Sequence, residues 1–130
     1  MSAVDTIKAA YAAFGRNDPA VLFGAMDSAI NWYEAEGTPF AVRNPYVGPQ
    51  AVGEGVFGPL LAAIDNFTVV PNTFIDGGNH VVVLGRYGGT MKNGGGRLDC
   101  AFCHVFRFQG DKAVMFQQFT DTAQWTRLLT

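Results

Sequence analysis

The sequence predicts an α+β fold, in which helices pack on one face of a curved antiparallel sheet. Apolar residues in the first half recur at three- and four-residue spacing, which is typical of helices, whereas those in the second half alternate with a period of two between glycine-rich turns. Helices that precede an antiparallel meander indicate the α+β class. The chain has 130 residues, of which 48% are hydrophobic and 15% charged. We therefore expect a single domain over residues 1–130, with a buried core.

Three helices are expected in the first half of the chain. The first is capped by Ser2, ends before Gly15, and carries an apolar stripe that consists of Val4, Ile7, Tyr11 and Phe14. A second, short helix follows Asp18-Pro19, because a carboxylate can cap it and proline is tolerated in its first turn. The third spans Pro49 to Ile64, where three glycines weaken it, and a kink is expected at Pro59.

Five strands and a last helix complete the predicted fold. The segment from Thr38 to Gly48 contains two prolines and is expected to be mostly loop. Asp121 is placed to cap a short final helix that runs through Leu129. The strands are expected at Ile30 to Ala35, Phe67 to Ile75, His80 to Met91, Arg97 to Phe108 and Ala113 to Phe119.

The strand from Arg97 to Phe108 has two different faces. The first is strongly apolar with a single histidine, and it consists of Leu98, Cys100, Phe102, His104, Phe106 and Phe108. The opposite face is also partly apolar, which is unusual for a sheet face in water, and it consists of Asp99, Ala101, Cys103, Val105 and Arg107. If helices cover the first face, a second copy of the chain could cover the other. We therefore expect a homodimer through the sheet.

The turn at Gly110-Asp111 sets the register of the last two strands. A two-residue turn followed by a regular ladder places His104 opposite Gln117 and puts Asp121 on the same face as His104. A β-bulge would instead bring Gln118 to that face. The sequence leaves both registers open.

The composition excludes several functional classes. Nine Lys and Arg residues against eleven Asp and Glu give a net charge of −2, which lacks the basic surplus of nucleic-acid-binding proteins. No apolar run approaches the roughly 18 residues of a membrane span. Two cysteines and no recognisable signal segment make the cytoplasm the expected compartment. The 11 Phe, 4 Tyr and 2 Trp exceed what a small core needs, and they suggest an apolar cavity or interface.

Two motif matches are interpreted as structural. Cys100 to His104 has the spacing of a c-type haem attachment site, but it lies in a period-two strand, where cysteines three apart point to opposite faces. Gly53 to Gly58 matches the G-x-G-x-x-G pattern, but no strand precedes it and a proline follows it. We expect these glycines to allow close packing of the helix. No cofactor and no metal are therefore expected.

Three ionisable residues are candidates for catalysis. His104 lies on the apolar face of a central strand, Asp121 follows the last strand, and Glu34 shares one side of the first strand with Trp32. An acid and a base in an apolar pocket suit proton transfer next to a carbonyl, because burial raises a carboxyl pKa towards neutrality. Each candidate also has a structural interpretation: a satisfied core histidine, a helix N-cap and a glutamate that faces water.

Five stretches that include these candidates resemble the SnoaL-like, ketosteroid-isomerase-like group of the nuclear-transport-factor-2-like superfamily. They follow one another along nearly the whole chain and are Trp32 to Gly37, Tyr46 to Pro49, Val82 to Tyr87, Phe102 to Phe106 and Phe119 to Ala123. The resemblance implies a cone-shaped α+β fold, in which a strongly bent sheet wraps around three helices and encloses an apolar pocket. It also implies a homodimer through the outer sheet face. This fold hosts isomerases, cyclases, epoxide hydrolases and non-enzymes.

The resemblance also implies roles for individual residues. In polyketide cyclases of this kind an aspartate near the last strand is the general base and a histidine lies close by, and Asp121 and His104 occupy matching positions. Ketosteroid isomerases instead use an oxyanion hole of a tyrosine and a protonated aspartate, together with an aspartate base. That set has no complete match here, although Tyr11 is a candidate for the tyrosine and Glu34 loosely resembles the base.

The sequence thus predicts an isomerase- or cyclase-type enzyme that acts by carboxylate–histidine chemistry on a small, apolar, carbonyl-bearing compound. Asp121 takes the proton, His104 orients Asp121 or supplies a proton, and Glu34 and Gln118 hold polar atoms of the ligand. The pocket walls are expected to include Trp32, Tyr87 and Phe102. Two alternatives are a non-catalytic module that binds an apolar ligand in the same pocket, and a structural dimerisation domain in which His104 and Asp121 satisfy each other.

Overall fold

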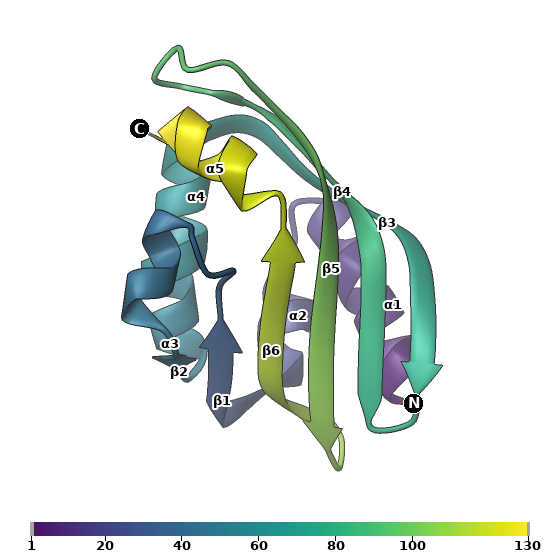
Figure 1. The fold of residues 1–130 in the computed structure, drawn as a ribbon. Helices are drawn as coiled ribbons and strands as arrows, with labels where there is room; N and C mark the ends of the chain where they lie inside the picture. Colours follow the sequence, from purple (N-terminus) through teal and green to yellow (C-terminus); the bar gives the residue numbers. More distant parts are fainter. Residues whose placement is uncertain (1, 130) are drawn as a thin grey trace.

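The computed structural model describes residues 2–129 and contains a single six-stranded sheet with helices packed against it (Figure 1). The strands are β1 (Met26–Tyr33), β2 (Tyr46–Val47), β3 (Ile64–Gly77), β4 (His80–Met91), β5 (Arg97–Gln109) and β6 (Lys112–Thr120). Met1 and Thr130, which the single-domain prediction includes, lie outside the described residues. The predicted α+β class is confirmed.

The sheet order is β2-β1-β6-β5-β4-β3. The run from β3 to β6 is the predicted antiparallel meander. However, β1 pairs in parallel with β6, so the sheet is mixed rather than wholly antiparallel. The short strand β2 lies in the segment that was expected to be loop, and it pairs with β1. Alternation along one strand shows which residues share a face, but it does not show which neighbour the strand pairs with or in which direction.

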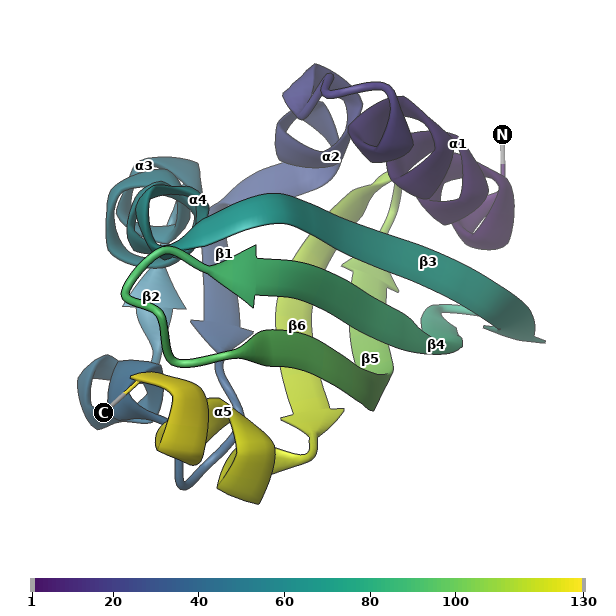
Figure 2. The same cartoon turned by 90° about the horizontal axis from the view of Figure 1, so that it is seen from above.

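The helices are α1 (Ala3–Gly15), α2 (Ala20–Ala25), α3 (Pro49–Val52), α4 (Gly58–Ala63) and α5 (Thr122–Leu129), with a short 3-10 segment at Pro39–Arg43. The Ser2 cap is confirmed, because its hydroxyl oxygen accepts a hydrogen bond from the backbone N–H of Asp5. Figures 1 and 2 show α1 and α2 against one face of the sheet, α3 and α4 beside β1 and β2, and α5 across the end where β6 finishes.

The third predicted helix is one continuous rod with an irregular centre. A π-helical turn over Gly53–Phe57 joins α3 to α4, so the irregularity lies just before Pro59 rather than at it. Gly55 in this turn packs on the ring of Tyr46, since a Cβ at position 55 would lie 2.5 Å from Cε2 of Tyr46. The G-x-G-x-x-G stretch therefore serves close packing, as expected, and its partner is a strand residue.

The inner face of β5 forms the centre of the core. All six residues predicted to face inward, from Leu98 to Phe108, are buried. The buried residues of α1, including Ile7 and Tyr11, join the same apolar cluster. The period-two pattern of this strand therefore identified the core face correctly.

The β5–β6 hairpin contains the β-bulge that the sequence left open. Gln109 pairs with Lys112 across the turn, but the register then shifts, because Phe108 pairs with Ala113 and Arg107 with Met115. One extra residue in β6 moves every later partner by one position. His104 consequently lies opposite Gln118, and the regular register with Gln117 inward is wrong.

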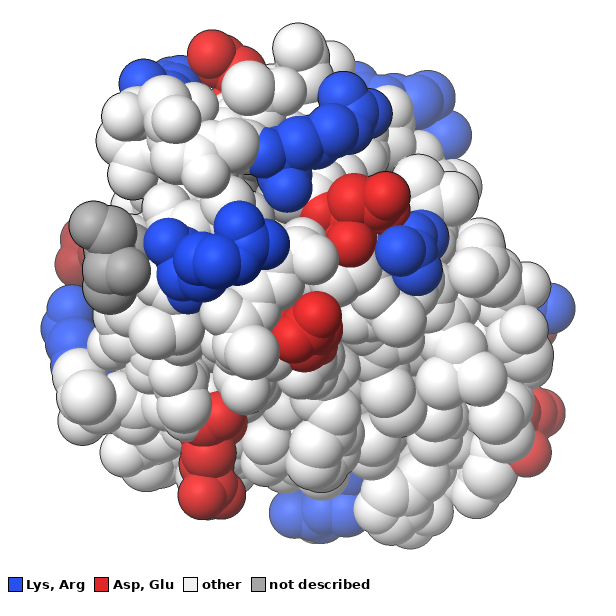
Figure 3. Space-filling view, turned by 45° about the horizontal axis from the view of Figure 1, so that its top comes forward, with Lys and Arg blue, Asp and Glu red and all other residues white. Residues whose placement is uncertain are grey.

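The surface carries both signs of charge. On the face in Figure 3, basic and acidic side chains are interspersed and neither forms a continuous patch. Within residues 2–129 no helix has the length and apolar character needed to cross a membrane.

Candidate active site

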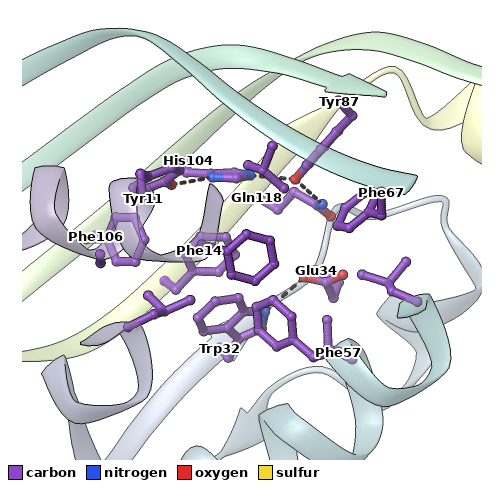
Figure 4. A pocket seen from close by; sticks show the side chains of 16 residues that line it. Tyr11, Phe14, Trp32, Glu34, Phe57, Phe67, Tyr87, His104, Phe106 and Gln118 are labelled. Atoms are coloured by element: carbon purple, nitrogen blue, oxygen red, sulfur yellow. Dashed lines mark hydrogen bonds between the residues drawn. The ribbon is translucent and has the colours of Figure 1, made fainter. Parts of the chain in front are cut away.

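A cavity of about 60 Å³ lies between the inner face of the sheet and the helices. Its walls are mainly aromatic and include Phe14, Trp32, Phe57, Phe67, Phe106 and Phe116. Five residues with polar side-chain atoms also line it, namely Tyr11, Glu34, Tyr87, His104 and Gln118 (Figure 4). The surplus of aromatic residues in the sequence is thus partly explained by this cavity.

His104 bridges two tyrosines. Its Nδ1 lies 2.5 Å from the hydroxyl of Tyr11 on α1, and its Nε2 lies 2.5 Å from the hydroxyl of Tyr87 on β4. The ring of Phe102 stacks on the imidazole, with 4.0 Å between the centroids. Burial lowers the pKa of His104 to about 3, because a charged imidazolium would be desolvated in this apolar site. The histidine is therefore neutral at physiological pH.

The two tyrosines are hydrogen-bond donors over the whole physiological range. Burial raises the pKa of both Tyr11 and Tyr87 well above 10, so neither phenol ionises near neutral pH. The side chain of Gln118 extends the chain of hydrogen bonds, because its Nε2 donates to the Tyr87 hydroxyl at 2.8 Å. Its Oε1 accepts from the backbone N–H of Ala35 at 3.0 Å.

Glu34 supplies the carboxylate of the cavity. It directly follows β1 and is 3% exposed, so the alternative in which it faces water is wrong. One carboxylate oxygen accepts a hydrogen bond from Trp32 Nε1 at 2.9 Å. The Asn44 side chain accepts a hydrogen bond from the backbone N–H of Glu34 and donates one to its carbonyl oxygen. Burial raises the pKa of Glu34 from 4.5 to about 7, against a smaller lowering by the Trp32 bond. This carboxyl can therefore take up or release a proton near neutrality.

Asp121 lies outside the cavity. It is exposed, and its Oδ1 accepts a hydrogen bond from the backbone N–H of Gln124 at 3.2 Å, which is the geometry of a helix N-cap on α5. The prediction that Asp121 lies on the same face as His104 is wrong, because the bulge shifts the register of β6 by one residue and β6 ends at Thr120. The structure brings His104 and Glu34 to one cavity, and it assigns Asp121 to helix capping.

The N-cap geometry predicts the behaviour of two Asp121 variants. Asp121→Asn is expected to keep stability within about 0.5 kcal/mol, because asparagine caps helices as well as aspartate does, whereas Asp121→Ala is expected to lose about 1 kcal/mol. Both variants are expected to retain any activity of the cavity. Urea unfolding measures the stability of the variants, and hydrogen–deuterium exchange of a small ketone measures their activity. A loss of activity in Asp121→Asn without a loss of stability would contradict this placement.

The structure places three of the four residues expected in the pocket walls at the cavity. Trp32, Tyr87 and Gln118 line the cavity, whereas Phe102 is absent from its walls and instead supports the His104 ring. The sequence did not predict the contact between Tyr11 and His104, which are 93 positions apart. The available signal was a tyrosine within the apolar stripe of the first helix, which indicates a buried hydroxyl that needs a partner.

The cavity volume limits the ligand. About 60 Å³ is several times the roughly 10–15 Å³ that one water needs, but far below the roughly 300–1,000 Å³ of sites for drug-sized ligands. An engineered cavity that binds benzene measures about 150 Å³, so a ring-sized ligand requires the half-buried rings of Phe57 and Phe67 to move. Among the described residues no three His, Cys, Asp or Glu side chains are grouped to bind a metal ion.

Comparison with known proteins agrees with this architecture. A family model described as the SnoaL-like domain matches residues 7–116. An NTF2-like protein from Burkholderia thailandensis E264 is 32% identical, with a TM-score of 0.93 over 100% of this chain and 98% of its own. An NTF2-like protein of unknown function from Burkholderia pseudomallei K96243 is 30% identical, with a TM-score of 0.88 over 100% and 99%. TerC, crystallised with polyporic acid, is 23% identical, with a TM-score of 0.84 over 98% and 97%, and shows the shared fold. No curated protein is significantly similar in sequence.

Proposed function

This chain belongs to the SnoaL-like domain family, and we propose that it is an enzyme of the isomerase or cyclase type, which moves a proton at a carbon next to a carbonyl group. The observation that carries the proposal is the composition of one cavity. A buried carboxyl with a pKa of about 7 and a chain of neutral phenolic donors line the same aromatic space. A base and an oxyanion donor are the two groups that such a reaction needs.

In the proposed reaction Glu34 is the general base. Its carboxylate removes a proton from the carbon next to the carbonyl, and the electron pair of the broken C–H bond moves to the carbonyl oxygen. A tyrosine hydroxyl of the Tyr11–His104–Tyr87 chain donates a hydrogen bond to the enolate oxygen that forms. Glu34 then returns the proton to the same carbon or to another carbon of the conjugated system. His104 stays neutral and holds the two tyrosines in position.

Apolar burial supports this assignment of the base. A desolvated carboxylate is a stronger base than one in water, and its ordinary hydration would otherwise have to be removed during the reaction. Among the described residues no ion pair involves Glu34, so a cation does not weaken its basicity. The proposed substrate is therefore a small, largely apolar compound that carries a carbonyl group.

The experiment that tests the proposal is hydrogen–deuterium exchange of a small ketone. Cyclopentanone or cyclohexanone is incubated with the protein in D₂O, and the loss of the proton signals next to the carbonyl is followed by NMR. Exchange that is faster with the wild-type protein than with Glu34→Gln supports the proposal. Saturable binding of the ketone without exchange would favour the alternative of a non-catalytic binding module in the same cavity.

We also propose that the outer face of the sheet binds a second copy of the chain. Leu84, Cys103 and Phe119 form one row across β4, β5 and β6, and Val82 and Val105 lie in the next row. Leu84 and Phe119 are 39% and 55% exposed, so this apolar surface is open to water in one copy alone. A symmetric dimer would bury the surface against itself.

A charged residue in this row is expected to separate the dimer. Phe119→Glu should halve the mass measured by light scattering, because a dimer interface cannot bury the carboxylate without a partner. The control is Val42→Glu, which places the same charge on a residue that is 85% exposed and outside the sheet, and it should leave the mass unchanged. A monomeric wild-type protein at micromolar concentration, or a Phe119→Glu protein of unchanged mass, would contradict the proposed interface.

A further inference from the structure

The hydrogen-bond chain through His104 contains one more proton than its own bonds can use. Tyr11 and Tyr87 each carry a hydroxyl proton, and the neutral imidazole carries one N–H proton. The two O···N contacts require one proton each. One hydroxyl proton therefore remains, and its tyrosine lines the cavity whichever of the two it is. The hydrogen-bonded group Tyr11–His104–Tyr87 can therefore donate one hydrogen bond to a ligand.

The side chain of Gln118 is oriented unambiguously. The backbone N–H of Ala35 can only donate, so the amide atom that faces it must be the carbonyl oxygen Oε1. The other end of the amide is then the NH₂ group, which lies 2.8 Å from the Tyr87 oxygen and donates to it. The oxygen of Tyr87 thus already accepts one hydrogen bond before His104 is considered.

The two tautomers of His104 use the tyrosine oxygens differently. If Nδ1 carries the proton, it donates to Tyr11 and Tyr87 donates to Nε2, so each phenol oxygen accepts one hydrogen bond. If Nε2 carries the proton, Tyr87 must accept from both Gln118 and His104, whereas Tyr11 accepts none. A phenol oxygen shares one lone pair with its ring and is a poor acceptor of two bonds. The first arrangement is also directed one way from Gln118 to Tyr11, so that each bond polarises the next.

We propose that Gln118 holds His104 in the tautomer with the proton on Nδ1, and that Tyr11 is therefore the hydroxyl that donates to the ligand. Gln118 is in this respect a positioning residue, because it acts on Tyr11 through Tyr87 and His104. The tautomer follows from the hydrogen-bond geometry alone, whereas the contact of Tyr11 with a carbonyl oxygen rests on the proposed function. The ligand class is a compound with a hydrogen-bond acceptor placed at Tyr11 and an acidic C–H placed at Glu34.

The tautomer can be measured in the ligand-free wild-type protein. Long-range ¹H–¹⁵N NMR spectra of uniformly ¹⁵N-labelled protein distinguish a protonated ring nitrogen from an unprotonated one. We expect His104 to show a protonated Nδ1 and an unprotonated Nε2, with no change between pH 5 and pH 8. The only other histidine, His80, is exposed and serves as an internal reference. A protonated Nε2 on His104 would overturn the proposal.

Gln118→Glu is expected to reverse the direction in which the hydrogen bonds between residue 118 and Tyr11 are donated, and the two side chains have nearly the same size. At a pH at which the introduced carboxyl is ionised, one of its oxygens still accepts a hydrogen bond from the backbone N–H of Ala35. The other oxygen has no proton to donate, so it can only accept a hydrogen bond from the Tyr87 hydroxyl. Tyr87 must then accept from Nε2, and Tyr11 must donate to Nδ1, so the tautomer is expected to invert and the spare proton is used up. An unchanged Nδ1–H tautomer in this variant would show that Gln118 does not set it. The wild-type spectrum remains decisive if the variant does not fold.

The ligand contact has a separate readout. The carbonyl carbon of ¹³C-labelled cyclopentanone is expected to shift downfield on binding to the wild-type protein, because a donated hydrogen bond polarises the carbonyl group. The shift should be lost in Tyr11→Phe. A retained shift would show that Tyr11 is not the donor. Absence of ketone exchange and binding would count against the proposed function, whereas the tautomer result would stand independently.

Discussion

Glu34→Gln is expected to lose proton exchange and, at pH 8, to be more stable than the wild-type protein by up to about 3 kcal/mol. The native state raises the pKa of Glu34 from 4.5 to about 7, so it binds a proton more tightly than the unfolded chain does. Stability from this group is fully present below pH 4.5 and is lost as the pH rises through 7. Glutamine remains neutral and avoids the loss. The two proteins should have similar stability near pH 4.

Glu34→Gln is expected to lose activity because glutamine has no carboxylate that can act as a base. Glutamine can still accept the hydrogen bond from Trp32 Nε1, so the walls of the cavity keep their arrangement. It cannot take a proton from carbon, and loss of a general base is expected to lower the exchange rate by about 10²- to 10⁴-fold. In the wild-type protein the rate should rise with pH through about 7, as the carboxylate form appears.

Urea unfolding between pH 4 and pH 8 and the ketone assay measure the two effects. The matched control is Glu36→Gln, because Glu36 is exposed and lies two residues further along the chain. It should change neither exchange nor the pH dependence of unfolding. Full activity in Glu34→Gln, or a loss of stability at pH 8, would refute the assignment of Glu34 as a buried base.

His104→Phe is expected to destabilise the protein at pH 7 by about 2–5 kcal/mol. Phenylalanine can keep the stacking on Phe102, but the buried hydroxyls of Tyr11 and Tyr87 each lose their hydrogen bond with His104, and Tyr87 keeps only the bond from Gln118. A buried polar group left without a partner costs about 1–3 kcal/mol. Denaturant unfolding at pH 7 measures the difference.

The same variant should be less sensitive to acid. Burial holds the pKa of His104 at about 3, below the ordinary 6.5, so the unfolded chain binds the proton more tightly. Stability from this group is present above pH 6.5 and is lost as the pH falls towards 3. Between pH 7 and pH 4 the wild-type protein should therefore lose about 3 kcal/mol relative to the variant.

The comparison of variant and wild type at each pH isolates His104, because Glu34 changes stability in the opposite direction over the same range and is present in both proteins. His80→Phe replaces an exposed histidine and is the matched control. A difference between His104→Phe and wild type that does not change with pH would contradict a neutral, buried imidazole.

Local patterns in the sequence predicted where two of the candidate residues lie. Alternation along β5 placed His104 on the inner face, and alternation at the end of β1 placed Glu34 beside Trp32. The role assigned to Asp121 depended on counting pairs along the hairpin. A single extra residue in β6, opposite Arg107, changes that count, and no pattern in the sequence distinguishes Gln117 from Gln118 as the inward residue.

The sequence by itself determined the α+β class and the residues of the core face of β5, including His104. These properties follow from hydrophobic periodicity and capping, which act over a few neighbouring residues. Only the tertiary structure decided the parallel pairing of β1 with β6, the bulge, and the contact of Tyr11 with both His104 and the cavity. Those features join residues far apart in the chain, and their geometry depends on how helices and strands pack together.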